Sequence, residues 1–446
     1  MFSLIQAASD FVDKPGFNWK LLITGFTISS FLFESYLTHR QIKSIRSNGK
    51  VIPKQLESKI DEKTAIKSQD YSLTKLRFSQ ITKLVSLAEN LAFIRFDVLP
   101  KLWASSASFL AKLTFLPPIL TGVIPQSLVF LTQMGFISTI LGLPIAYYSN
   151  FVIEEKYGFN KLTIKLWITD MIKEALVSIV IGFPVMSIFL KIIDYFGDSF
   201  MFYVSIFLFV FQIFMIIVYP KFIQPLFNKL EPLQEGELKT EIEKLASKNK
   251  FPLDKLFVID GSARSSHSNA YFMGLPWGSK QIVLFDTLIE TSTVPETIAV
   301  LGHEIGHWAL SHTTKTLITG QFHIFTMFTM FAAFVKNKSL FQSFGFANET
   351  PIIVGFLLFN DILKPVDAVL SFVLNLVSRK HEYEADKYAV DQGYATELKT
   401  ALITLHKENL SSLSTDWLFS SYHHSHPHLT ERLEAIDVAS ESFKKE

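Results

Sequence analysis

The chain of 446 residues contains no cysteine. This absence excludes disulfide bonds, thiolate metal ligands, a cysteine nucleophile and lipidation of the protein's own cysteines. Any metal site must therefore use histidine and carboxylate ligands. Charge is also scarce, because charged residues make up 19% of the sequence, below the roughly 25% of an ordinary soluble protein. The net charge of +1 offers no bulk attraction for a nucleic acid, so no nucleic-acid partner is expected.

What the chain has instead is apolar sequence, with 49% hydrophobic residues and 43 phenylalanines. A helix needs about 20 apolar residues to cross a bilayer, and several stretches approach or exceed this length. They cover residues 17–37, 84–115, 123–153, 175–190, 199–220, 316–335 and 351–377. The first lacks the basic start and cleavage site of a signal peptide, so we expect it to remain as an anchor. The composition predicts a mainly α-helical, polytopic membrane protein with seven transmembrane helices.

Two of these stretches carry charge. The second has three charged residues between positions 95 and 101, so we expect an amphipathic or shorter span there. The last is interrupted by Asp361, Lys364, Pro365 and Asp367. Charges within a span usually mark a polar cavity or a pairing network. The alternative is that Pro365 breaks the helix near an interface and leaves the charges in water.

The loops predict an orientation. Residues 39–83 contain 11 Lys or Arg against four Asp or Glu, which favours the cytoplasmic side. Seven spans then place the N-terminus in the lumen and the C-terminus in the cytoplasm. The loop 336–349 becomes lumenal and holds two glycosylation sequons, at Asn337 and Asn348, whose use the sequence leaves open.

These features divide the chain into four parts. Residues 1–227 hold the first five spans, 228–315 form a cytoplasmic segment, 316–377 hold the last two spans, and 378–446 form a polar cytoplasmic segment. The second part is expected to contain a small β-sheet beside a polar helix. The predicted helix covers residues 236–247, and the predicted strands cover 256–260, 269–272 and 281–285.

The sequence His303-Glu304-Ile305-Gly306-His307 is an HExxH motif. Residues four apart lie on the same side of a helix, which lets two imidazoles bind one Zn²⁺ while the glutamate acts as general base. A chance match in a chain with 12 histidines is unlikely, on the order of a few per cent. Gly306 costs roughly 1 kcal/mol of helix propensity, and a small residue there lets a neighbouring backbone or the metal approach.

A catalytic zinc takes three protein ligands plus water, so a third ligand is needed. Glu382 and Asp386 share one face of a predicted polar helix over residues 378–386. We expect Glu382 to bind the metal and Asp386 to accept a hydrogen bond from a ligand histidine. Glu384 or His381 can serve instead, and a merely solvated charged helix is the simpler alternative.

Further segments accompany these motifs. They are the sequence HEIGHW at 303–308, the tripeptide Ser425-His426-Pro427, Arg432, and residues 34–37, 154–160, 264–272 and 282–288. With them, the chain resembles the CAAX prenyl protease family of integral-membrane zinc endopeptidases over nearly its whole length. The resemblance implies a ring of seven helices around a chamber, with the zinc domain capping its cytoplasmic end.

The resemblance also implies roles for individual residues. It assigns His303, His307 and Glu382 as ligands of one Zn²⁺ per chain, Glu304 as catalytic base, and Asp386 as the residue that orients a ligand. The remaining candidates are expected near the substrate backbone and the developing oxyanion: Asn269, His426 and Arg432. Without the resemblance, the simpler roles of a helix cap and a structural ion pair carry more weight for His426 and Arg432.

The implied reaction removes the last three residues of prenylated CaaX proteins, with a second, upstream cut in an a-factor-like pheromone precursor. The expected location is the endoplasmic reticulum membrane or the nuclear envelope, with a monomeric chain in contact with membrane lipid. One alternative is a membrane quality-control protease without a strict prenyl requirement. Another is a non-enzymatic scaffold or transporter, which predicts that Glu304→Ala leaves function intact.

Overall fold

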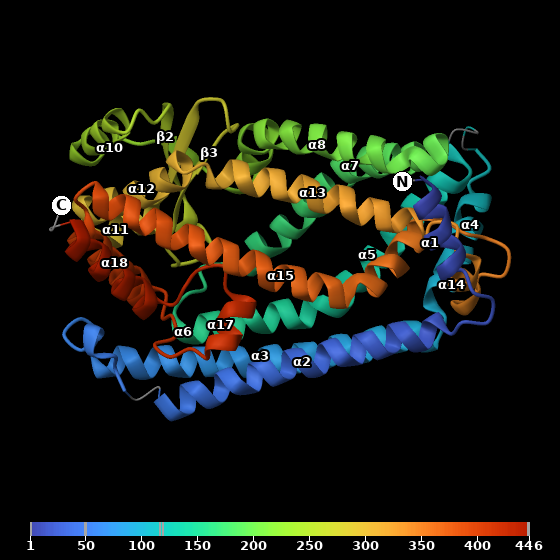
Figure 1. The fold of residues 1–446 in the computed structure, drawn as a ribbon, viewed down its shortest axis with the longest axis horizontal. Coiled ribbons are helices and arrows are strands. Elements are labelled where there is room, and N and C mark those ends of the chain that lie inside the picture. The colour runs from blue at the N-terminus through green and yellow to red at the C-terminus, as the bar shows by residue number, and fades with distance from the viewer. Residues whose placement is uncertain (1, 49–50, 116, 118–119, 444–446) are drawn as a thin grey trace.

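The computed structural model describes residues 2–48, 51–115, 117 and 120–443, and it is mainly helical. Long helices run along one axis of an elongated molecule, and a small sheet lies near one end of that axis (Figure 1). The N-terminal helix α1 (Phe2–Val12) lies toward the opposite end, with α4 (Val98–Lys112) and α14 (Lys338–Ser343). The two chain termini therefore lie toward opposite ends of the molecule.

The other elements complete this arrangement. The long helices are α2 (Trp19–Asn48), α3 (Glu62–Arg95), α5 (Val123–Tyr148), α7 (Ile164–Phe196), α8 (Phe200–Val218), α13 (His312–Ala332) and α15 (Ile352–Asp391). The shorter ones are α6 (Glu155–Tyr157), α9 (Gln224–Phe227), α10 (Glu237–Lys248), α11 (Asp286–Thr291), α12 (Val294–Ala309), α16 (Ala395–Glu408), α17 (Trp417–His423) and α18 (Leu429–Phe443).

Among the described residues, three helical stretches are long and apolar enough to cross a membrane. They are Trp19–Asn48, Val123–Tyr157 and Ile164–Phe227. The third contains both α7 and α8, which pack against each other after a turn at Gly197, whose φ is +52°. Length and composition thus account for part of the predicted bundle, and the count of seven spans stays a prediction.

The region of the predicted second span, an amphipathic or shorter span between residues 84 and 115, does not form one helix. Helix α3 ends at Arg95, and Asp97, with a left-handed φ of +51°, is the cap residue just before α4 begins at Val98. The long helix is instead α3, which packs along α2. Its charged first half hides it from a search for apolar runs. The carboxylate of Asp97 forms an ion pair with Lys20 of α2, so one of the charges in this region is satisfied within the protein.

The alternative in which Pro365 breaks the last span is wrong, because α15 continues through this residue from Ile352 to Asp391. The proline removes one backbone donor, a loss that tertiary packing tolerates. Asp361 and Lys364 form an ion pair of 2.8 Å and line a cavity of about 240 Å³ between α2, α3, α4 and α15. This arrangement favours the polar-cavity interpretation of the charges. The predicted boundary at residue 377 lies inside this continuous helix.

Four strands form a sheet in the order β1-β2-β4-β3. They are β1 (Leu230–Pro232), β2 (Leu253–Ile259), β3 (Ala270–Met273) and β4 (Lys280–Phe285). The three predicted strands and the helix α10 are confirmed within a few residues, whereas the short, proline-containing β1 escaped prediction. Strands β2 and β4 are parallel, the other pairs are antiparallel, and β3 is an edge strand. A core that includes Ile242, Leu284 and Leu301 packs α10 and α12 onto the sheet.

The loop before β3 is attached to the membrane helices. Asn160 and Ser265 form an isolated antiparallel bridge, and Arg264 donates two hydrogen bonds of 2.9 and 3.0 Å to Asp170 of α7. Segment 154–160, one of the family-like motifs, therefore helps to fix the loop that leads into the edge strand.

Candidate metal centre

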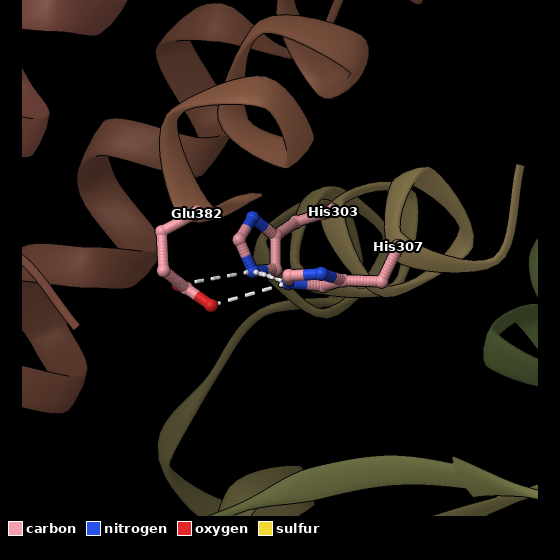
Figure 2. A group of neighbouring side chains, drawn as sticks. All are labelled: His303, His307 and Glu382. Atoms are coloured by element: carbon pink, nitrogen blue, oxygen red, sulfur yellow. Dashed lines mark hydrogen bonds and ion pairs between the residues drawn. The ribbon is translucent and has the colours of Figure 1, made fainter. Parts of the chain in front are cut away.

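Helix α12 carries the HExxH motif and has a strong N-terminal signal. Thr293 and Glu296 form a capping box, in which each side chain accepts from the other residue's backbone N–H. Pro295 occupies the first turn, where its missing N–H costs nothing. The helix then places His303 and His307 one turn apart on the face that meets α15 (Figure 2).

Gly306 sets how closely the two helices approach. A Cβ atom at this position would lie 3.0 Å from Cβ of Tyr388 and 3.2 Å from the backbone of Ala385. These distances are at or below the limit of ordinary contact, so a larger residue would push α15 away. Of the two explanations given for a small residue at this position, the close approach of a neighbouring backbone therefore applies.

The close approach brings Glu382 of α15 to the two histidines (Figure 2). His303 Nε2 and His307 Nε2 lie 3.1 Å apart. The carboxylate oxygens of Glu382 lie 3.5 Å from His303 Nε2 and 3.3 Å from His307 Nε2. A tetrahedral zinc with bonds of about 2.0–2.1 Å holds its ligand atoms about 3.3–3.4 Å apart. The three side chains therefore fit one small tetrahedral ion without rearrangement.

The surroundings of Glu382 support the same conclusion. Its side chain is 4% exposed, and among the described residues its Oε2 atom accepts no hydrogen bond. His426 Nδ1 lies 2.7 Å from this oxygen, as an ion-pair contact. Burial alone would raise the pKa of Glu382, but His307, His426 and the charge of Arg432 hold that pKa well below its usual range. The carboxylate is thus kept ionised, as a metal ligand must be.

Asp386 contacts Nδ1 of His303, the ring nitrogen that does not face His307 and Glu382. Its Oδ1 lies 2.9 Å from His303 Nδ1, and both of its oxygens accept hydrogen bonds from Arg432, at 2.6 and 2.8 Å. Burial would raise the pKa of Asp386, but Arg432 and His303 lower it. This carboxylate lies where it fixes the ring of His303 with Nε2 toward the cluster.

Glu304 lies on the same helix between the two histidines. Burial raises the pKa of the Glu304 carboxyl above its usual range, and the imidazoles of His303 and His307 offset only part of that rise. A carboxylate with a raised pKa is better suited to take up a proton near neutral pH than an ordinary glutamate.

The other predicted residues are placed differently. Asn269 immediately precedes the edge strand β3, and its Oδ1 accepts from the N–H of Ala270. His426 has a side chain that is 64% exposed, beside Glu382. Arg432 forms an ion pair with Asp386, so its contacts are those of the structural ion pair named as the simpler role for this residue.

The two alternative third ligands lie in a neighbouring cluster. Glu384 Oε2 is 3.0 Å from Nε2 of His312, and the ring of His381 stacks on the ring of His312. His312 was not among the predicted site residues, although it lies only five positions after His307. Its proximity to the motif was the one available signal.

The long apolar helices and the buried histidine–carboxylate cluster together describe a membrane metallopeptidase. Residues 41–229 match the family model described as CAAX prenyl protease N-terminal, five membrane helices, and residues 232–440 match peptidase family M48. The chain belongs to the CAAX prenyl protease 1 family of M48 peptidases, as full-length relatives also show. It is therefore a metallopeptidase and a multi-pass membrane protein, as the sequence predicted.

The relatives cover nearly the whole chain. CAAX prenyl protease 1 of Saccharomyces cerevisiae is 48% identical over 97% of this chain and 98% of its own length. The CAAX prenyl protease 1 homolog of Homo sapiens is 40% identical, over 92% and 94%. The crystal structure of Ste24p from S. mikatae has a TM-score of 0.89 and 49% identity, covering 95% of this chain and all of that one.

Proposed function

We propose that this protein is a zinc endopeptidase that removes the C-terminal three residues of prenylated CaaX proteins. The observation that supports it most directly is the fit of His303, His307 and Glu382 to one tetrahedral ion, within a chain whose full-length relatives bear the name CAAX prenyl protease 1. Histidine and carboxylate ligands in this number are those of catalytic zinc.

Zinc, when bound, polarises the scissile carbonyl and lowers the pKa of water toward ~7. Glu304 then accepts the proton of the attacking water on its carboxylate and passes it to the leaving amine. The position of Glu304 on α12, directly after His303, suits both transfers.

The two candidate oxyanion residues have different roles in this proposal. His426 is exposed at the cluster and can donate a hydrogen bond to the developing oxyanion, where it would count most in the transition state. Arg432 is 11% exposed and holds Asp386, so it acts mainly by neutralising the buried carboxylates. Asn269, at the start of β3, is placed to contact a substrate backbone.

The free edge of β3 suggests how the peptide binds. An extended substrate can add to an edge strand through backbone hydrogen bonds, which tolerate different side chains. The anchoring of the preceding loop by Asn160 and Arg264 keeps this edge in a fixed place relative to the membrane helices.

We further propose that seven helices, with α3 in place of the span first predicted, enclose a chamber in the endoplasmic reticulum membrane or nuclear envelope. The N-terminus is lumenal, and the metal centre, formed by segments 228–315 and 378–446, is cytoplasmic. The termini at opposite ends of the molecule support an odd number of spans (Figure 1). The chain is proposed to act as a monomer, and an upstream cut in a pheromone precursor is proposed as a second activity.

The test compares farnesylated and unfarnesylated versions of one CaaX peptide, with the purified protein in lipid vesicles and its metal content measured. We expect one zinc per chain and a strong preference for the farnesylated peptide. Glu304→Gln should abolish cleavage, by roughly 10²–10⁴-fold, while retaining zinc. Equal rates on both peptides would support the quality-control alternative, and full activity of Glu304→Gln would contradict the proposed base.

A further inference from the structure

The second ring nitrogen of His307 has a partner that the HExxH motif does not include. His307 Nδ1 lies 3.0 Å from Nδ1 of His312, and His312 Nε2 lies 3.0 Å from Oε2 of Glu384. His312 is 3% exposed, whereas Glu384 is 37% exposed. We propose that His312 and Glu384 are positioning residues that fix the ring and tautomer of His307 for metal binding. This inference rests on the zinc site proposed above.

The hydrogen-bond directions agree with this role. His307 must leave Nε2 free for the metal, because this atom faces His303 and Glu382, so its proton lies on Nδ1. Nδ1 of His312 must then accept, which places the proton of His312 on Nε2, where it is donated to Glu384. One arrangement of protons therefore satisfies every contact and presents a lone pair of His307 to the metal.

The turn between α12 and α13 makes the contact possible. Ser311 has a left-handed φ of +57°, and His312 is the first residue of α13. The turn brings His312 back against His307, five residues earlier, where it is buried. Lys380 Nζ also lies 3.7 Å from the Glu384 carboxylate, and the side chain of Lys380 is 75% exposed.

A second metal ion is the competing interpretation, because His312, His381 and Glu384 also offer ligand atoms close together. The rings of His312 and His381 are stacked, however, with centroids 4.0 Å apart and planes at 11°. The lone pairs of imidazole lie in the ring plane, so stacked rings do not direct them at one ion. Both nitrogens of His312 are also already engaged, one with His307 and one with Glu384.

The experiment measures the zinc dissociation constant by chelator competition in the full-length purified protein. His312→Phe keeps a flat ring against His381 but removes both hydrogen bonds, and it should weaken zinc binding roughly 10–100-fold. His312→Asn should weaken zinc binding less than His312→Phe does, because the side-chain oxygen of the asparagine can replace Nδ1 as hydrogen-bond acceptor. Glu384→Gln, which removes only the charge, should give a smaller weakening that still exceeds twofold.

The matched control is Asp391→Asn, the same kind of change in an exposed ion pair with Lys387 on the same helix, which should leave zinc binding unchanged. A thermal midpoint of metal-free His312→Phe equal to that of the metal-free unaltered protein would show that this variant folds. If His312→Phe does not fold, the zinc affinity of Glu384→Gln is the deciding measurement. Zinc binding within twofold of the unaltered protein in the deciding variant overturns the proposal. So does a second zinc per chain that Glu384→Gln removes. Neither result depends on which peptide the enzyme cleaves.

Discussion

Helices α12 and α8 distribute their polar and apolar residues in opposite ways. Helix α12 buries Glu296, Thr297 and His303 with much of its length. Helix α8 has no charged residue, yet Val210 is 58% exposed and Phe214 is 53% exposed. Polar groups can be buried in α12 because they are paired with one another or can bind a metal. Apolar groups can be exposed in α8 because a membrane helix has lipid around it.

The largest effect is expected from removing the carboxylate charge that lies against His303 and His307 in the cluster. Glu382→Gln keeps the shape of the side chain but removes an ionised ligand, so zinc affinity should fall by at least ~10²-fold and cleavage should be lost. Zinc content and cleavage rate measure the effect. Asp437→Asn, in a surface pair with Lys399, is the matched control and should be silent. A Glu382→Gln chain that retains its zinc would show that this carboxylate is not a ligand.

The opposite change is a charge on the apolar surface of α8. Val210→Lys places a charge near the middle of the helix, which costs roughly 2.5–3.5 kcal/mol on an insertion scale. The fraction of membrane-inserted protein should fall, whereas Val210→Leu should leave it unchanged. Equal insertion of the two variants would mean that Val210 faces water in a chamber rather than lipid.

A smaller effect tests the close packing of α12 on α15. Gly306→Ala adds a methyl group against the backbone of Ala385, and this overpacking should lower the free energy of unfolding by about 1–3 kcal/mol. The gain of roughly 1 kcal/mol in helix propensity offsets only part of that cost. The thermal midpoint should fall. Gly320→Ala in α13, where nothing lies within 4 Å of the added atom, should keep or raise it. A rise in both variants would contradict the contact.

The smallest effect concerns a buried polar atom that is not paired. Among the described residues, Nε2 of His406 has no hydrogen-bond partner, and burial together with the neighbouring His428 lowers the pKa of His406 to about 3. The unfolded chain binds this proton more readily, so the contribution of His406 is fully present above pH ~6.5 and is lost as the pH falls toward 3.

At pH 5.5 the loss amounts to about 1.4 kcal/mol, for one pKa unit of difference. The thermal midpoint of His406→Gln should therefore fall less between pH 7.5 and 5.5 than that of the unaltered protein. His39→Gln, at an exposed histidine, should behave like the unaltered protein. Parallel pH dependence in all three proteins would rule out a contribution from His406.

The sequence predicts what short-range geometry determines. The i, i+4 spacing of His303 and His307, and of Glu382 and Asp386, gives each pair a common helix face, and the structure brings the two faces together. Apolar length likewise locates both ends of α5 and α8 within about five residues, and it locates the start of α2. In these cases the information lies within one turn or one span.

Other features depend on contacts that no local pattern reports. Helix α3 is hidden by its charged first half, and it is recognised only by its packing along α2. Pro365 predicts a break in isolation, yet α15 continues because its neighbours support it. The contact of His312 with His307 depends on the left-handed turn at Ser311, and the short separation of the two histidines in the sequence does not by itself predict it.

Helix α15 carries both the ion pair of Asp361 with Lys364 and the side chain of Glu382. At 1.5 Å per residue, the 18 residues from Lys364 to Glu382 span about 27 Å, close to the thickness of a bilayer's hydrocarbon core. The length of this helix segment therefore fixes the distance between the metal centre and the polar cavity. Inserting one residue between these points would turn Glu382 by about 100° around the axis and away from both histidines, with every side chain of the site intact.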